Sequence, residues 1–202
     1  MNNDYFNYQK CVDDLTAVLS IGYFFKYSTD VIEKRISNSK YFANFNKDFF
    51  SSESYISTDE VIESIYFDAD IDDNTKIIVY NELEWVSMMY IHIIKETGLG
   101  FEAIFCYAPI EKASSMYHLY HELDFSKCVE WFYEQMKKES IIKIAMKRLH
   151  LTNEYVSSKT NISSSMIDAL KNRRRDVRKL DVERAIKLSK TLNINIETLL
   201  DS

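Results

Sequence analysis

Residues 141–175 read IIKIAMKRLHLTNEYVSSKTNISSSMIDALKNRRR, a pattern that predicts two short helices joined by a tight turn. The first helix has apolar positions at helical spacing: Leu151, Tyr155, Val156 and Thr160. Thr152 can cap its start, because a threonine hydroxyl accepts an otherwise unpaired backbone N–H. Asn161 falls where the chain must leave the helix sharply. Asparagine tolerates the left-handed conformation, so it can replace the usual glycine there.

The second helix begins after Ser163, which is the next candidate cap. Its predicted buried side consists of Met166, Ile167 and Leu170. The helix then runs into a basic cluster made of Lys171, Arg173, Arg174 and Arg175. A short helix, a turn and a second helix that ends in basic residues is the arrangement that places a helix in a DNA major groove.

These residues resemble the lambda-repressor/Cro-like (XRE-type) helix-turn-helix domain over residues 141–202. Residues 151–154 (LTNE) stand where that family typically has Leu-Ser-Gln-Glu, and Asn161 stands at its turn glycine. Further matches are Val156–Ser157, Ile162–Ser163 and Ile167, and residues 180–200 match the fourth and fifth helices, with Asp181 as a cap and Asn193 at a C-cap turn. Two departures are Lys171 and Arg173, which replace the family's usual Glu and Gly. The loop 176–180 also looks longer than usual and lacks the typical proline.

The resemblance implies roles for individual residues toward double-stranded DNA. The residues expected at base edges are Ser164, Ser165, Asp168 and Ala169. The residues expected at phosphates are Asn153, Lys171, Asn172, Arg173, Arg174 and Arg175. Serine and alanine read bases weakly beside arginine or glutamine. We therefore expect modest specificity from one domain and a homodimer on paired half-sites.

Charge and aromatic residues divide the chain into two parts. Residues 141–202 hold 13 Lys and Arg against 7 Asp and Glu, or +6, whereas residues 1–140 hold 12 against 24, or −12. Of the 28 aromatic residues, only Tyr155 lies after residue 140. Such asymmetry predicts a nucleic-acid-binding module joined to a different domain. We therefore expect an acidic, aromatic-rich domain over residues 1–139 and a helix-turn-helix domain over 140–202.

Three glycines, one proline and the absence of sustained strand alternation predict an all-α chain. The helices expected before residue 140 are 8–27, a short one after Asp30, one opened by a capping box at Ser57, 75–97 with Gly98 as its C-cap, 101–107, one begun by Pro109, and 127–139 capped by Ser126. Residues 37–54 are either a loop or a short helix held by Phe42, Phe45, Phe49 and Phe50.

Two patterns could bind a metal, and neither is complete. In FDADIDDN (67–74), Asp68, Asp70 and Asp72 alternate as calcium ligands do, but Asp73 and Val79 occupy the positions that need Gly and Glu. An acidic, solvated turn is the favoured interpretation. His118 and His121 share a helix face without a third ligand, so a structural role is favoured.

No enzyme motif is present, and we expect no cofactor and no catalytic or metal site. The three cysteines (Cys11, Cys106 and Cys128) have no CxxC spacing and are expected to be reduced thiols of a cytoplasmic protein. The beginning MNNDYFNYQK lacks the basic and apolar regions of a signal peptide, and no apolar run is long enough for a membrane span.

The expected function is a DNA-binding transcriptional regulator, most simply a repressor, with an N-terminal domain that dimerises or senses a partner. The alternative is an antitoxin or inhibitor, whose acidic N-terminal domain covers a basic protein partner such as a toxin while the helix-turn-helix regulates its own operon. A third interpretation treats residues 1–139 as a dimerisation unit whose aromatic residues are simply core.

Overall fold

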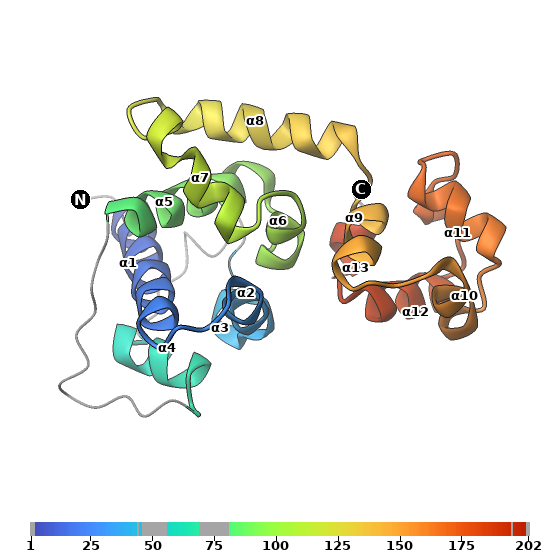
Figure 1. The fold of residues 1–202 in the computed structure, drawn as a ribbon, viewed down its shortest axis with the longest axis horizontal. Helices are drawn as coiled ribbons and strands as arrows, with labels where there is room; N and C mark the ends of the chain where they lie inside the picture. The colour runs from blue at the N-terminus through green and yellow to red at the C-terminus, as the bar shows by residue number, and fades with distance from the viewer. Residues whose placement is uncertain (1–2, 44, 46–55, 69–80, 195, 201–202) are drawn as a thin grey trace. The chain divides into compact units, whose positions relative to one another are not determined.

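The computed structural model describes residues 3–43, 45, 56–68, 81–194 and 196–200. These residues form thirteen α-helices and one 3-10 turn and contain no β-strand, which confirms the all-α prediction (Figure 1). None of the helices in the described ranges has the length and apolar character needed to cross a membrane.

The chain divides into two compact units. The first comprises Met1–Ile104 and Ala108–Glu130, and the second comprises Phe105–Tyr107 and Trp131–Ser202. The second unit therefore begins before residue 140, the predicted boundary, and includes the last part of helix α8.

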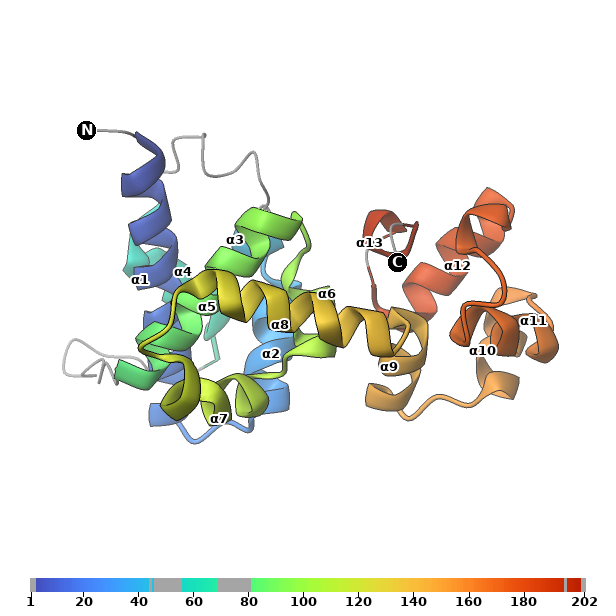
Figure 2. The same cartoon turned by 90° about the horizontal axis from the view of Figure 1, so that it is seen from above.

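The first unit is built around helix α1. Its helices are α1 (Asn3–Phe24), α2 (Thr29–Asn38), α3 (Lys40–Ala43), α4 (Thr58–Ile65), α5 (Asn81–Thr97), the start of α6 (Phe101–Tyr107), α7 (Ile110–Tyr120) and the start of α8 (Phe125–Lys138). Helix α1 packs against α4 and α5, and α5 also packs against α7 (Figure 2). Leu15 and Leu19 of α1 and Met89 and Ile93 of α5 are fully buried. Burial of such side chains is the main stabilising contribution to a helical core.

The phenylalanine-rich segment contributes to this core. Phe42 and Phe45 are each 1% exposed, and both rings pack against Phe101. Residues 37–38 of the segment end α2, and Lys40–Ala43 form the short helix α3, one of the two predicted alternatives, whereas Phe49 and Phe50 lie outside the described residues.

Several predicted helix ends are confirmed, and others are wrong. Helix α1 ends at Phe24 and not at residue 27, and α2 begins at Thr29, before Asp30. Ser57 and Glu60 form a reciprocal capping box, and Gly98 adopts a φ of 71° after α5. Helix α8 does not begin after Ser126 but at Phe125. There the carboxylate of Asp124 accepts a 2.8 Å hydrogen bond from the Ser126 N–H, because a carboxylate is a stronger acceptor than a serine hydroxyl.

A buried carboxylate joins three helices of the first unit. Asp14 of α1 is fully buried and accepts hydrogen bonds from Lys10 Nζ (2.9 Å), Thr58 Oγ1 (2.7 Å) and the hydroxyl of Tyr41. Burial and the bond to Asp14 raise the pKa of Tyr41. A charge in an apolar interior persists only when it is paired and hydrogen-bonded, and these three donors meet that requirement.

Gly22 allows a close approach of α1 to Tyr66 and Ile32. A Cβ at this position would lie 2.5 Å from the hydroxyl of Tyr66 and 2.7 Å from Ile32 Cδ1. That hydroxyl donates a 2.8 Å hydrogen bond to the carbonyl of Val18, which fixes the Tyr66 ring against α1.

The second unit contains five helices after α8. They are α9 (Ile141–Arg148), α10 (Asn153–Thr160), α11 (Ser164–Lys171), α12 (Val182–Leu192) and α13 (Ile196–Leu200), with a 3-10 turn at Val177–Lys179. Helix α10 packs against α11 and α12, and α9 packs against the same two helices. The predicted Asp181 cap and the left-handed Asn193 (φ 53°) are both confirmed at the ends of α12.

Candidate nucleic-acid interface

The turn between α10 and α11 has the predicted backbone. Thr152 accepts a hydrogen bond from the Tyr155 N–H, and Ser163 accepts one from the Met166 N–H, so both predicted N-caps are confirmed. Asn161 has φ 57° and ψ 27°, the left-handed conformation expected at this turn. The chain therefore leaves α10 sharply at Asn161 and starts α11 three residues later, at Ser164.

The buried side of this pair holds α11 in place. Val156 and Ile167 are fully buried, and Leu170 is 2% exposed. The prediction was wrong for Tyr155, which is 48% exposed and has Lys159 Nζ 5.7 Å from its ring centroid. The buried residues of this eight-residue helix are Val156 and Thr160, and Val156 directly follows the exposed Tyr155. Met166 is only half-buried.

The predicted base-contacting residues lie on the outer side of α11. Ser165 is exposed, whereas Ser164, Asp168 and Ala169 are half-buried. The Ser165 hydroxyl lies 3.1 Å from that of Ser163. The serines thus present small polar groups at the N-terminal end of α11, where backbone N–H groups are also oriented outward.

Asp168 is already engaged within the protein. Its carboxylate forms an ion pair with Arg174 and accepts a 3.1 Å hydrogen bond from Asn172 Nδ2. Three of the predicted DNA-contacting residues therefore interact with one another. The ion pair neutralises a carboxylate that would otherwise repel phosphate.

Asn153 and Lys171 meet although 18 residues separate them. Lys171 Nζ donates a 3.0 Å hydrogen bond to Asn153 Oδ1, which joins the start of α10 to the end of α11. An ammonium group has three donors, and an amide nitrogen has two. The pair therefore keeps donors for a further acceptor while each side chain holds the other in position.

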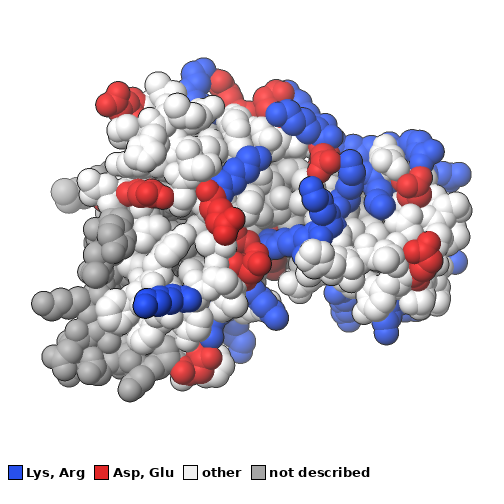
Figure 3. Space-filling model, viewed as in Figure 1, with Lys and Arg blue, Asp and Glu red and all other residues white. Residues whose placement is uncertain are grey.

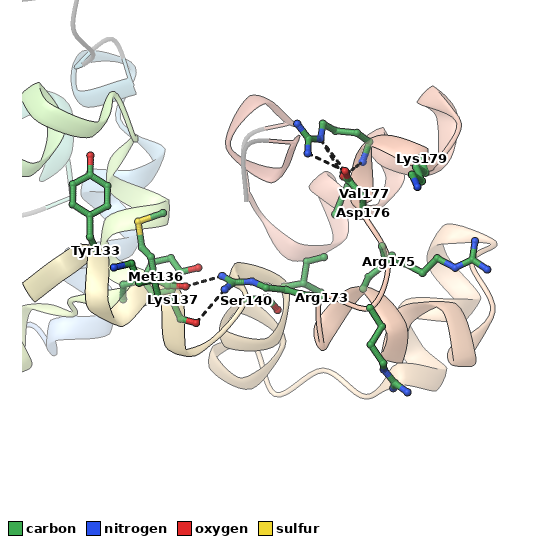
Figure 4. Close-up of a pocket in the computed structure, with 14 residues that line it drawn as sticks. Tyr133, Met136, Lys137, Ser140, Arg173, Arg175, Asp176, Val177 and Lys179 are labelled. Atoms are coloured by element: carbon green, nitrogen blue, oxygen red, sulfur yellow. Dashed lines mark hydrogen bonds and ion pairs between the residues drawn. The ribbon is translucent and has the colours of Figure 1, made fainter. Parts of the chain in front are cut away.

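Arg173 bonds to α8 carbonyl groups. Its guanidinium donates to the carbonyl oxygens of Met136 (2.7 Å), Glu139 (3.1 Å) and Lys137 (3.2 Å), as Figure 4 shows in part. The carbonyls of Met136 and Lys137 lie in the last turn of α8, where intrahelical partners are lacking, and Glu139 directly follows the helix. Burial, the first cause, raises the pKa of neighbouring Tyr107 to about 12, and the charge of Arg173 acts in the opposite direction.

The backbone of Arg173 lies in an unusual conformation. Its φ is 54°, and the N–H groups of Arg173 and Arg174 bond to the carbonyls of Leu170 and Ala169. This is the Schellman ending of a helix, in which glycine is the common residue at the left-handed position. The departure from glycine noted in the sequence thus supplies a side chain that binds α8.

Arg175 is exposed, and its guanidinium has no hydrogen-bond or ion-pair partner among the residues that the structure describes, although its backbone N–H bonds to the carbonyl of Ala169. Figure 4 shows its side chain extending away from that of Arg173. On the face drawn in Figure 3, Lys and Arg side chains outnumber Asp and Glu over the second unit. Arg175 is therefore the arginine of the cluster best suited to meet an external phosphate.

Ser140 and Tyr107 belong to the same arrangement, and sequence reasoning missed both. The Ser140 hydroxyl donates to the carbonyl of Lys171, and the Tyr107 hydroxyl donates to that of Glu139. Ser140 precedes an apolar helical pattern, so its capping role had a local signal. Nothing local in the sequence around Tyr107 indicates its contact, because the partner lies 32 residues away.

The two candidate metal patterns are not assembled in the described residues. Both carboxylate oxygens of Asp68 accept hydrogen bonds from Arg35, at 2.7 and 2.8 Å, and the hydrogen bonds lower the pKa of Asp68. Asp70 and Asp72 lie outside the described residues. His121 Nδ1 lies 2.9 Å from the carbonyl of Tyr117, and no group of three metal-ligating side chains occurs in the described ranges.

Comparison of the chain with protein-family models, curated proteins and solved structures found no match.

Proposed function

We propose that the protein is a sequence-specific DNA-binding transcriptional regulator that contacts operator DNA through α10 and α11. The observation that carries the proposal is the Asn153–Lys171 hydrogen bond, which joins the start of α10 to the end of α11, while the left-handed Asn161 turn joins the other ends of the two helices. Together they fix two donor side chains at the ends of α10 and α11. Such donors can position a helix on the phosphate backbone while its N-terminal residues face base edges.

In this proposal the predicted contacts separate into three groups. Asn153, Lys171 and Arg175 bind phosphates, and Ser164 and Ser165 reach base edges. Asp168, Asn172 and Arg174 form an internal cluster that shapes the surface beside them. Arg173 does not contact DNA in this proposal; its guanidinium holds the end of α11 to α8. Because serines discriminate bases weakly, two copies on paired half-sites provide the specificity.

The test is binding of the full-length protein to DNA from its own promoter region at about 50 and about 200 mM salt. We expect promoter-selective binding that weakens as salt rises. Arg175→Ala should weaken binding to every sequence and reduce the magnitude of the salt slope by about 1, because one phosphate contact is lost. Lys34→Ala removes an exposed cation from the first unit and serves as the matched control.

The assignment of Ser164 and Ser165 to base edges has a separate test. Replacing Ser164 and Ser165 by alanine should broaden the set of sequences selected from a random pool while leaving the salt slope unchanged. A folded protein that binds no duplex at low salt contradicts the proposal. An unchanged selected-site profile for the serine variant contradicts only the assignment of the base-reading residues.

A further inference from the structure

An ion pair lies on the outer side of α11, among the residues predicted to meet DNA. The guanidinium of Arg174 contacts Oδ2 of Asp168, and Asn172 Nδ2 donates a 3.1 Å hydrogen bond to Oδ1 of the same carboxylate. The Asn172 amide also donates to the backbone carbonyl of Asp168 at 2.9 Å, so it holds the carboxylate beside the helix. Both carboxylate oxygens of Asp168 therefore have donors within the protein itself.

The backbone that follows α11 places Arg174 at this carboxylate. The Arg174 N–H donates a 2.8 Å hydrogen bond to the carbonyl of Ala169, in the turn made by the left-handed Arg173. The three arginines of this turn therefore differ in their side-chain contacts. Arg173 binds backbone carbonyls, Arg174 binds a carboxylate of α11, and the Arg175 guanidinium has no partner in the described part of the chain. Of the three, Arg174 is the one whose charge is neutralised by a residue predicted to face the bases.

The ion pair is accessible to an external partner. The Arg174 side chain is 63% exposed, and that of Asp168 is 44% exposed. Ion pairs with such exposure contribute little to the stability of a fold, so groups of a DNA duplex can replace either partner. A phosphate that takes Arg174 alone leaves the carboxylate unpaired beside a second negative charge, and the two repel each other. Arg174 is therefore released at low cost only where another donor binds Asp168.

The base edges of DNA offer such a donor. Ser164 and Asp168 are four residues apart in α11, so both lie on the helix face assigned to the bases. In the major groove, a carboxylate accepts a hydrogen bond from the N4 amino group of cytosine. The N6 amino group of adenine stands beside the N7 acceptor, and guanine and thymine present acceptors at their major-groove edges. Cytosine is therefore the base that suits Asp168.

We propose that Asp168 determines sequence specificity by controlling Arg174. Where cytosine faces α11, Asp168 accepts the N4 hydrogen bond, and the released Arg174 binds a neighbouring phosphate. At any other base the ion pair persists, and the complex lacks both contacts. This role of Asp168 rests on the proposed function, which places α11 in the major groove. It adds a base pair that is read through a change in phosphate contacts to a surface of weakly discriminating serines.

The first test compares full-length wild type with Asp168→Asn in the selection of duplexes from a random pool. Asparagine has nearly the shape of aspartate without its charge, and it pairs with N6 and N7 of adenine. We expect one position of the selected sequence to change from cytosine to adenine. The control is Glu130→Gln, which removes one negative charge from the exposed Glu130–Lys127 pair of the first unit and should leave the selected sequence unchanged.

The second test measures the salt dependence of binding to two duplexes that differ only at this position, with cytosine in one and guanine in the other. For the wild type, the salt slope should be larger in magnitude by about 1 on the cytosine duplex, because one further phosphate contact forms there. Arg174→Gln should abolish the difference between the two slopes. General repulsion between Asp168 and the phosphates would act on both duplexes equally and would give no such difference.

A selected sequence that is the same for wild type and Asp168→Asn overturns the proposal, because the carboxylate then reads no base. A slope difference that persists in Arg174→Gln also overturns it, since another residue then supplies the phosphate contact. If the wild type binds its promoter but has equal slopes on the two duplexes, the role of Asp168 fails and the proposed function stands. A folded wild type that binds no duplex at low salt overturns both.

Discussion

The hydroxyl of Ser140 donates a 2.6 Å hydrogen bond to the carbonyl oxygen of Lys171, the last residue of α11. The hydroxyl oxygen of Ser140 also accepts a hydrogen bond from the Lys143 N–H and so caps α9. One buried hydroxyl therefore starts one helix and binds the end of another.

Ser140→Ala should lower the free energy of unfolding by about 2 kcal/mol, because the cap and the bond to Lys171 are both lost. Ser163→Ala is the matched control, since Ser163 caps α11 without bonding another helix, and it should cost about 1 kcal/mol. Urea unfolding measures both values. Equal losses in the two variants would show that the bond to Lys171 contributes nothing.

Replacement of Arg173 separates its backbone strain from its side-chain bonds. Arg173→Gly removes the strain of a positive φ but also the three bonds to α8, so a net loss of about 1 kcal/mol is expected. Arg173→Ala keeps the strain and loses the bonds, and it should cost about 2 kcal/mol. Thermal unfolding of both variants and the wild type ranks their stabilities. An alanine variant as stable as the wild type would mean that the guanidinium bonds do not stabilise the fold.

Asp14 provides a test of the first unit. Asp14→Ala should cost about 3 kcal/mol or more, because Lys10 loses its buried counter-charge and the hydroxyls of Tyr41 and Thr58 lose an acceptor. The neighbouring Asp13 is exposed, and Asp13→Ala should change stability by less than about 0.5 kcal/mol. Denaturant titration compares the two. Similar values would remove Asp14 from the interactions that hold α1, α3 and α4 together.

His92 should make stability depend on pH. Burial, and then the charge of Lys95, lowers the pKa of its imidazole below the ordinary value of 6.5. The unfolded chain therefore takes up this proton at a higher pH than the folded protein does. Stability is fully present above about pH 6.5 and falls as the pH drops toward the folded-state pKa.

His92→Gln removes this titration. As the pH falls from about 7.5 to about 5.5, the unfolding free energy of the wild type should decrease more than that of the variant. A pH-independent difference would contradict the role of His92. The ring is also stacked on Phe125, with centroids 4.8 Å apart, so the variant is expected to lose some stability at every pH.

Local chemistry made much of the second unit predictable. The Thr152 and Ser163 caps and the left-handed Asn161 depend on residues within one helical turn, and sequence reasoning found all three. The exposed Tyr155 was predicted wrongly because two overlapping helical spacings are present in eight residues, and only tertiary packing selects between them.

Long-range contacts could not be predicted in this way. Arg173 lies in a basic run, which favours a phosphate contact, yet its acceptors are carbonyls 34 to 37 residues away. Long-range contacts also explain why the second unit begins before the predicted boundary at residue 140. The charge and aromatic content change at residue 140, whereas the second unit also includes Phe132, whose ring packs on Tyr107 with centroids 5.8 Å apart. The change in composition marks where the charge and aromatic content of the sequence change. The start of the second unit depends instead on tertiary contacts such as the one between Phe132 and Tyr107.

Gly22 affects how variation in related chains should be interpreted. Any side chain there would collide with Tyr66 and Ile32, so selection for folding alone would keep glycine at this position. An invariant residue of this kind is easily mistaken for part of a binding site, although its contribution is the absence of atoms. Combined substitutions distinguish a packing role from a binding role. If glycine is kept only for packing, alanine at position 22 should be tolerated where smaller residues replace Tyr66 and Ile32.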